Sequence, residues 1–168
     1  MTESSRVTLL PDNMSLFTRS PTSDSGHCPL CILIIDEDSD CVDALKMLLT
    51  DIPGVGNVLT ATNAAAALTE LAAPKAGGTV QYPDVIFIDL KTRVDRMAST
   101  QATLRALRRR MPAAEIVLLN VYPSGITRSL RGLVDRSIRK DTSYRELRAL
   151  IDELTDTPTS TVAGLAAG

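Results

Sequence analysis

Apolar and polar residues alternate along this chain in blocks that have the lengths of strands and helices. Short runs made almost only of apolar residues predict strands that are covered on both faces, and longer segments with apolar residues every three or four positions predict helices. We expect strands at Cys31–Ile35, Asn57–Ala61, Val85–Ile88, Ile116–Leu119 and, more weakly patterned, Asp135–Ile138. We expect helices from a Ser39 cap to Ile52, then at Asn63–Ala73, Ser99–Met111, Ile126–Leu133 and Ser143–Leu154.

Five strand–helix units in succession predict an α/β fold in three layers, α/β/α, around a five-stranded parallel sheet with right-handed crossovers. The chain has 168 residues, which is room for one domain. Residues 1–28 and 157–168 are rich in small and polar residues without a period, so we expect disordered tails around a domain at 29–156. Ligands of such sheets bind at the carboxyl ends of the strands, where the strand order reverses.

Composition and charge narrow the choice of function. Tryptophan is absent and aromatic residues make up 3%, which predicts an aliphatic core and disfavours a base-stacking surface for single-stranded nucleic acid. Residues 1–90 contain 4 Lys/Arg and 12 Asp/Glu, whereas residues 91–148 contain 14 and 5, so the second half is basic. Three cysteines, and no apolar run long enough for a leader or a membrane span, favour the cytoplasm.

Charged and polar side chains follow four of the five predicted strands. They are Asp36, Glu37 and Asp38 after the first strand, Asp89 after the third, Asn120 after the fourth and Lys140 after the fifth. In a parallel sheet all of them project from one edge. Crowded carboxylates call for a hard divalent cation or a raised pKa, and Mg²⁺ prefers oxygen ligands. A lysine beside them can neutralise a phosphoryl group, so the set fits phosphoryl transfer onto an aspartate.

The segments IIDED, FIDL and IRKDTSYREL, in this order at these strand ends, resemble the receiver domain of bacterial two-component response regulators. The resemblance covers roughly residues 31–154. It implies a flavodoxin-like fold with strand order 2-1-3-4-5, a sensor histidine kinase or phosphotransfer protein as phosphate donor, and Mg²⁺ as cofactor. By position it implies the following roles: Asp89 as phosphoacceptor, Asp36, Glu37 and Asp89 as metal ligands, Lys91 as a further ligand through its backbone carbonyl, and Lys140 as the phosphate partner.

The sequence also departs from that family. Asn120 stands where a threonine or serine is usual, Thr92-Arg93 replaces the usual Met-Pro, and Ser137 replaces an aromatic residue. We therefore expect an atypical, single-domain response regulator in which Asn120 faces the phosphate site as an amide donor. The alternative is a pseudo-receiver, a regulatory module that binds proteins without being phosphorylated.

A downstream protein partner is expected on an arginine-rich face around the fourth and fifth predicted helices. Its residues are Arg128, Arg131, Arg139, Arg145 and Arg148, which suit an acidic partner. No helix-turn-helix pattern follows residue 156, so direct DNA binding is not expected, and a homodimer is left open.

The acidic and cysteine motifs have three other possible interpretations. An apolar strand followed by Asp-x-Asp also resembles the first motif of haloacid-dehalogenase-type phosphohydrolases, with Asp36 as nucleophile and Asp38 as acid and base, although Asp40 and the missing second acidic pair do not fit. Hydrolase activity is therefore not the main expectation.

A calcium-binding loop is not expected after the first strand, because Cys41 and Met47 occupy the positions where glycine and glutamate are needed. His27, Cys28 and Cys31 could suggest a zinc or redox site, but we interpret the two cysteines as incidental or buried thiols.

Overall fold

The fold is described from a computed structural model, which defines residues 28–72, 82–90, 97–120 and 128–156. The predicted tails, apart from Cys28, and nearly all of the Pro74–Pro83 loop lie outside these residues. In the part of the chain that is described, no helix has the length and apolar character needed to cross a membrane.

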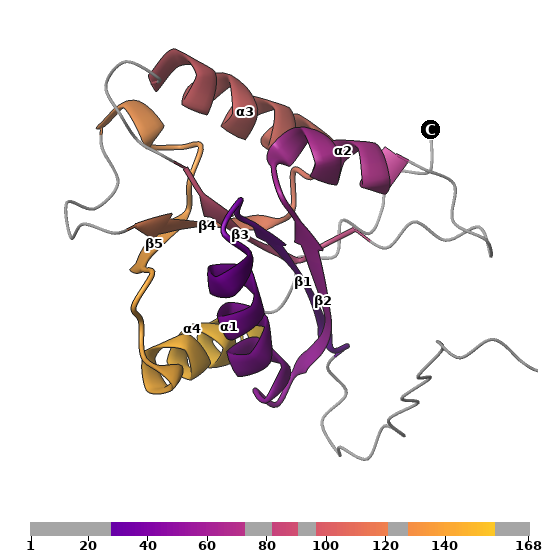
Figure 1. The fold of residues 1–168 in the computed structure, drawn as a ribbon, viewed down its shortest axis with the longest axis vertical. Helices are drawn as coiled ribbons and strands as arrows, with labels where there is room; N and C mark the ends of the chain where they lie inside the picture. Colours follow the sequence, from indigo (N-terminus) through magenta and orange to yellow (C-terminus); the bar gives the residue numbers. More distant parts are fainter. Residues whose placement is uncertain (1–27, 73–81, 91–96, 121–127, 157–168) are drawn as a thin grey trace, which may run out of the picture.

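Five parallel strands form one sheet in the order β2-β1-β3-β4-β5 (Figure 1). The strands are β1 Leu30–Ile35, β2 Val55–Ala61, β3 Val85–Asp89, β4 Glu115–Asn120 and β5 Arg136–Arg139. The predicted flavodoxin-like order is confirmed. The order reverses beside β1, so β1 and β3 are neighbours in the middle of the sheet and their carboxyl ends open at the switch point.

Four helices cover the two faces of the sheet in pairs, which completes the three predicted layers (Figure 1). Helices α1 (Ser39–Thr50) and α4 (Tyr144–Asp156) pack on one face, and α2 (Ala64–Ala72) and α3 (Met97–Arg110) pack on the other. The predicted helix at Ile126–Leu133 is reduced, in its described part, to one 3-10 turn, η2 at Arg128–Leu130. Gly132, with φ of +79°, reverses the chain directly after it.

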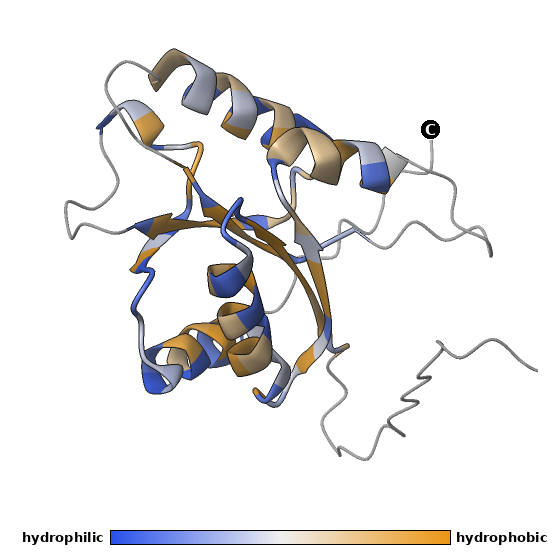
Figure 2. Ribbon diagram, viewed as in Figure 1, coloured by the Kyte–Doolittle hydropathy of each residue, from blue (hydrophilic) through white to orange (hydrophobic). Residues whose placement is uncertain are grey.

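The core divides according to which side of the sheet each strand residue faces. Ile32 and Ile34 of β1 contact the α1 and α4 layer, and Leu33 and Ile35 contact the α2 and α3 layer. Figure 2 shows these apolar strands enclosed between helices whose polar sides face outward. The core is aliphatic as predicted, with Phe87 as its buried aromatic side chain among the described residues. Cys31 is buried and Cys28 is exposed, and neither forms a disulfide with another described cysteine.

The start of α1 differs from the prediction by one residue. The cap is Asp38, not Ser39, because the Asp38 carboxylate accepts hydrogen bonds from the backbone N–H groups of Asp40 and Cys41 at 3.1 and 3.3 Å. A carboxylate at this position also interacts favourably with the positive end of the helix dipole. One of the three acidic residues after β1 therefore has a structural role in the helix.

Candidate functional site at the carboxyl edge of the sheet

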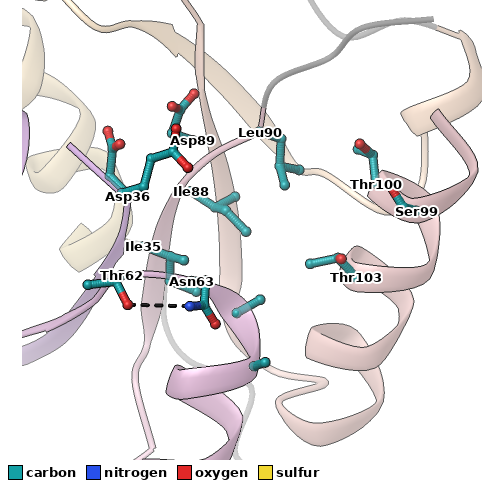
Figure 3. Close-up of a pocket in the computed structure, with 13 residues that line it drawn as sticks. Ile35, Asp36, Thr62, Asn63, Ile88, Asp89, Leu90, Ser99, Thr100 and Thr103 are labelled. Carbon is teal, nitrogen blue, oxygen red and sulfur yellow. Dashed lines mark hydrogen bonds between the residues drawn. The ribbon is translucent and has the colours of Figure 1, made fainter. Parts of the chain in front are cut away.

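Two aspartates meet where the central strands end. Ile35 of β1 is paired with Ile88 of β3, so the next residues, Asp36 and Asp89, leave the sheet side by side. The Asp36 N–H donates to the Ala61 carbonyl of β2 at 3.1 Å, which holds the first residue after β1 in the line of the strand. Figure 3 shows the two carboxylates close together at this edge.

Lys140, which directly follows β5, binds both aspartates at this edge. Its Nζ donates to Asp36 Oδ2 at 2.7 Å and to Asp89 Oδ2 at 2.8 Å. The backbone N–H of Lys140 donates to the Asn120 carbonyl at 2.8 Å, which extends the β4–β5 pairing by one bond and positions the side chain. Two aspartates that are widely separated in the sequence thus share the ammonium group of Lys140.

Burial and neighbouring charges have opposite effects on the pKa values of Lys140 and Asp89. The side chains of Asp36, Asp89 and Lys140 are 1%, 14% and 19% exposed. Burial raises the pKa of Asp89, and the carboxylates of Asp36 and Asp38 add to the increase, while the hydrogen bond from Lys140 opposes it. Burial alone would lower the pKa of Lys140, but its hydrogen bonds to Asp36 and Asp89 outweigh burial and the pKa is raised. Lys140 is therefore held in its charged form.

The other two acids after β1 are exposed and differ from Asp36. Asp38 donates its backbone N–H to Asp36 Oδ1 at 3.0 Å, so the cap of α1 also fixes the Asp36 carboxylate. Hydrogen bonds from the backbone and side chain of Cys41 lower the pKa of Asp38. Glu37 is exposed and lines the mouth of the cavity described next.

A cavity of about 350 Å³ opens beside the two aspartates, between the start of α2 and the first turns of α3 (Figure 3). Apolar residues of the strand ends line one part and hydroxyl and amide side chains of the helices line the other. The lining polar residues are Asp36, Glu37, Thr62, Asn63, Asp89, Ser99, Thr100 and Thr103. The serine and threonine side chains of this cavity were not predicted from the sequence, because single serines and threonines at helix starts are also common as caps.

Asn120 lies at the same edge with its side chain engaged elsewhere. Its Nδ2 donates to Ser137 Oγ at 2.7 Å, across the β4–β5 pair. Asn120 and Ser137 are two of the positions at which the sequence departs from the usual receiver pattern, and here they are hydrogen-bonded to each other. Lys91, predicted as a ligand through its carbonyl, lies outside the described residues.

The oxygen atoms at this edge fit Mg²⁺ in number and chemistry. Within the described ranges no group of three or more His, Cys, Asp and Glu side chains is gathered as a metal cage. Mg²⁺ does not need one, because it is usually held by one or two carboxylates, several waters and a phosphate oxygen. Asp36 and Asp89 supply two converging carboxylates, and exposed Glu37 lies at the rim.

The five arginines of the predicted partner face are not equivalent. Arg139 makes two hydrogen bonds to Asp141, at 2.7 and 2.6 Å, and Arg148 pairs with Asp152 at 3.6 Å. Arg128 belongs to η2, which is tied to α3 by the hydrogen bond from Gln101 Nε2 to the Ser129 carbonyl. Part of the predicted positive charge is therefore neutralised by neighbouring acids on the surface of β5 and α4.

Comparison with solved structures agrees with this geometry. A response regulator from Thermotoga maritima superimposes with a TM-score of 0.57 at 20% identity, over 75% of this chain and 97% of that one. The signal receiver domain of a signal transduction histidine kinase from Syntrophus aciditrophicus gives 0.57 at 20% identity, over 83% and 99%. The chain has the receiver-domain fold.

A third receiver-fold structure, the Thermotoga maritima response regulator TrrA in complex with Mg²⁺ and BeF, gives a TM-score of 0.54 at 21% identity, over 74% of this chain and 98% of that one. No family model and no curated protein sequence matches the chain. The likeness to receiver domains is thus one of fold.

Proposed function

We propose that this chain is an atypical receiver module of a phosphorelay, with Asp89 as the phosphoacceptor. The observation that carries the proposal is the Lys140 ammonium, 2.7 Å from Asp36 and 2.8 Å from Asp89 at the carboxyl ends of adjacent strands. A carboxylate, a second carboxylate and a fixed cation on one rim are the parts needed to accept and hold a phosphoryl group.

Accessibility favours Asp89 over Asp36 as the nucleophile. The Asp89 side chain is 14% exposed, whereas that of Asp36 is 1% exposed and has both oxygens engaged, Oδ1 with the Asp38 N–H and Oδ2 with Lys140. An incoming phosphorus atom must reach a carboxylate oxygen in line with its leaving group, which an enclosed carboxylate does not allow. The same contrast argues against a phosphohydrolase that uses Asp36 as nucleophile.

In the proposed reaction an Asp89 oxygen attacks phosphorus, the bond between phosphorus and the donor nitrogen breaks, and the nitrogen of the donor histidine keeps the electron pair. The donor is a histidine kinase or a phosphotransfer protein. Asp36, Asp89 and Glu37 are the residues that would hold Mg²⁺, which when bound supplies positive charge for the phosphoryl oxygens. Lys140 adds a second positive charge, and it reaches these oxygens by exchanging its carboxylate partners for them.

The test is direct phosphorylation by a small donor. Purified protein is incubated with Mg²⁺ and acetyl phosphate, and intact mass is measured. We expect a phosphate-sized gain for the wild type and for the surface control Asp152→Asn, and none for Asp89→Asn. An authentic receiver protein serves as the positive control.

Two results would change the proposal. If the wild type gains no mass while the authentic receiver does, the chain is a pseudo-receiver that binds partners without phosphate. If Asp89→Asn still gains mass, the phosphoacceptor is a different residue. Continuous Mg²⁺-dependent phosphate release that Asp36→Asn abolishes would instead favour the hydrolase.

A further inference from the structure

The outer side of α3 is a strip of small and basic residues. Ala98, Ala102, Arg105 and Arg109 are all exposed and follow one another at intervals of four, three and four positions, which places them on one side of the helix. The sequence of α3, MASTQATLRALRRR, contains no acid. The strip is therefore flat at its N-terminal end and positively charged at its C-terminal end.

The two arginines of the strip, Arg105 and Arg109, are exposed, and Arg105 also donates to Gln101 Oε1 at 3.4 Å. Arg108 turns inward, where it contacts Asp135 and the Ala114 carbonyl, and Arg110 lies over the Tyr82 ring at 5.5 Å from its centroid. Within residues 28–72, 82–90, 97–120 and 128–156, no carboxylate pairs with Arg105 or Arg109. Two cations thus stand on the surface without an acidic partner from this part of the chain.

The outer side of α1 has the opposite character. Asp40, Asp43 and Met47 are exposed at intervals of three and four positions, again on one side of a helix. Met47, 64% exposed, is the most exposed large hydrophobic residue in the part of the chain that the structure describes. The α1 strip is acidic at its N-terminal end and apolar at its C-terminal end.

The two strips match when the helices run in opposite directions. With Met47 against Ala102, Asp43 lies opposite Arg105 and Asp40 opposite Arg109, since the intervals from Met47 are four and seven residues and those from Ala102 are three and seven. Antiparallel helices also bring ends of opposite partial charge together. Because α1 and α3 cover opposite faces of the sheet (Figure 1), they cannot meet within one molecule.

We infer that copies of this chain associate head to tail, with the α1 strip of one copy (Asp40, Asp43, Met47) on the α3 strip of the next (Ala98, Ala102, Arg105, Arg109). The two surfaces differ, so the contact leaves a free strip at each end and leads to chains or closed rings. One helix against another makes a small, charged interface, so the association is weak and sensitive to salt. The inference does not depend on phosphorylation of Asp89.

The test is the association state of the full chain. Sedimentation velocity is measured over about a hundredfold range of protein concentration, at low and at high salt. We expect the average mass to rise with concentration at low salt and to fall back at high salt. A wild type that stays monomeric throughout at low salt overturns the inference.

Charge reversal gives the sharper measurement. Arg105→Glu/Arg109→Glu and Asp40→Arg/Asp43→Arg should each weaken self-association about tenfold or more, because like charges then face each other. An equimolar mixture of the two variants should associate again, since each supplies the strip that the other needs. Asp152→Arg/Asp156→Arg on α4, with the same change of charge as the α1 variant, should associate like the wild type.

Three outcomes would contradict the proposed contact between the α1 and α3 strips. The first is that the mixture of the two variants remains dissociated although both variants keep a wild-type circular dichroism spectrum and melting temperature. The second is that the α4 control loses association as fully as the α1 variant. The third is that the wild type instead binds duplex DNA through Arg105 and Arg109 while staying monomeric, in which case the basic strip serves a nucleic acid.

Discussion

At the scale of single residues, the Lys140 ammonium stabilises two neighbouring carboxylates, Asp36 and Asp89, in a largely buried position. Replacing it by methionine, which keeps most of the volume, leaves Asp36 and Asp89 facing each other without a cation. We expect Lys140→Met to lower the free energy of unfolding by about 1.5–3 kcal/mol at neutral pH, the usual loss for hydrogen bonds to charged groups. Urea unfolding measures this.

The matched control is Lys46→Met, which removes an exposed lysine of α1 and should change stability little. If both variants lose the same small amount, Lys140 does not stabilise the fold, and its two short contacts contribute nothing measurable in solution.

The hydrogen bond between Asn120 and Ser137 can be weighed by a double-mutant cycle. Asn120→Ala and Ser137→Ala each remove one partner of the 2.7 Å bond, and each should cost about 0.5–1.5 kcal/mol. Because both remove the same bond, the double variant should lose clearly less than the two single losses together. Strict additivity would mean that the bond contributes nothing to stability.

These residues mark how far the sequence could predict the site. Strand ends were readable from apolar runs that stop at a charged residue, so the nearness of Asp36, Asp89 and Lys140 followed from a parallel sheet. The partner of Asn120 was not readable, because it depends on the β4–β5 register, in which Leu118 is paired with Ser137 and Asn120 with Arg139. A one-residue change of register would have turned Ser137 to the other face of the sheet.

At the scale of elements, α4 begins with a capping box. Ser143 Oγ accepts from the Glu146 N–H, and Glu146 Oε2 accepts from the Ser143 N–H at 2.9 Å and from its hydroxyl. The hydrogen bonds that the Glu146 carboxylate accepts from the Ser143 N–H, the Ser143 hydroxyl and the Thr142 hydroxyl lower its pKa from the ordinary value of 4.5. The stabilisation is complete above pH 4.5 and is lost as the pH falls through the lowered value.

We therefore expect Glu146→Gln, which can still accept hydrogen bonds, to lose less stability on acidification below pH 4.5 than the wild type loses. Urea midpoints collected from neutral to acid pH report the difference. Two parallel pH profiles would show that Glu146 has the same pKa in the folded and unfolded chain. Asp152→Asn, an exposed change on the same helix, is the reference.

The turn between α1 and β2 depends on one glycine. Gly54 has φ of +90°, and its carbonyl accepts a hydrogen bond from the Leu30 N–H at 2.8 Å. A Cβ at this position would lie 3.3 Å from the Thr155 methyl carbon. We expect Gly54→Ala to cost about 1–2 kcal/mol from the left-handed backbone alone, seen as a lower melting temperature. Gly132→Ala is the control, because Gly132 also has a positive φ but has open space around it. Any loss of stability in Gly54→Ala beyond that of Gly132→Ala is then due to crowding against Thr155 and not to backbone strain.

Element positions were predicted better than element ends. Runs such as Ile32–Ile35 and Ile86–Ile88 are short, rich in β-branched residues and followed closely by charged residues, which favours a buried strand over a helix, so the strands of the sheet could be predicted from the sequence. The cap of α1 was misplaced because Asp38 and Ser39 are both good caps, and the backbone direction decides between them. The short helix before β5 was overestimated because its apolar spacing is typical of a helix, whereas Gly132 ends the described turn early.

At the scale of the whole molecule, Mg²⁺ should act as a stabilising ligand if the proposed site is correct. A cation that binds only the folded chain raises the free energy of unfolding, by about 1.4 kcal/mol when its concentration is ten times the dissociation constant. We expect Mg²⁺ to raise the melting temperature of the wild type and to have little effect on Asp36→Asn. An equal rise in both would place the cation elsewhere.

The bond between Asp36 and Lys140 joins positions 104 residues apart. During synthesis on the ribosome, the first four strands leave the exit tunnel before the lysine does. A truncated or partly made chain thus carries Asp89 without its counter-ion. Only a chain that has received its last strand acquires a complete site, so under the proposed function a phosphate donor would act on finished molecules and not on fragments.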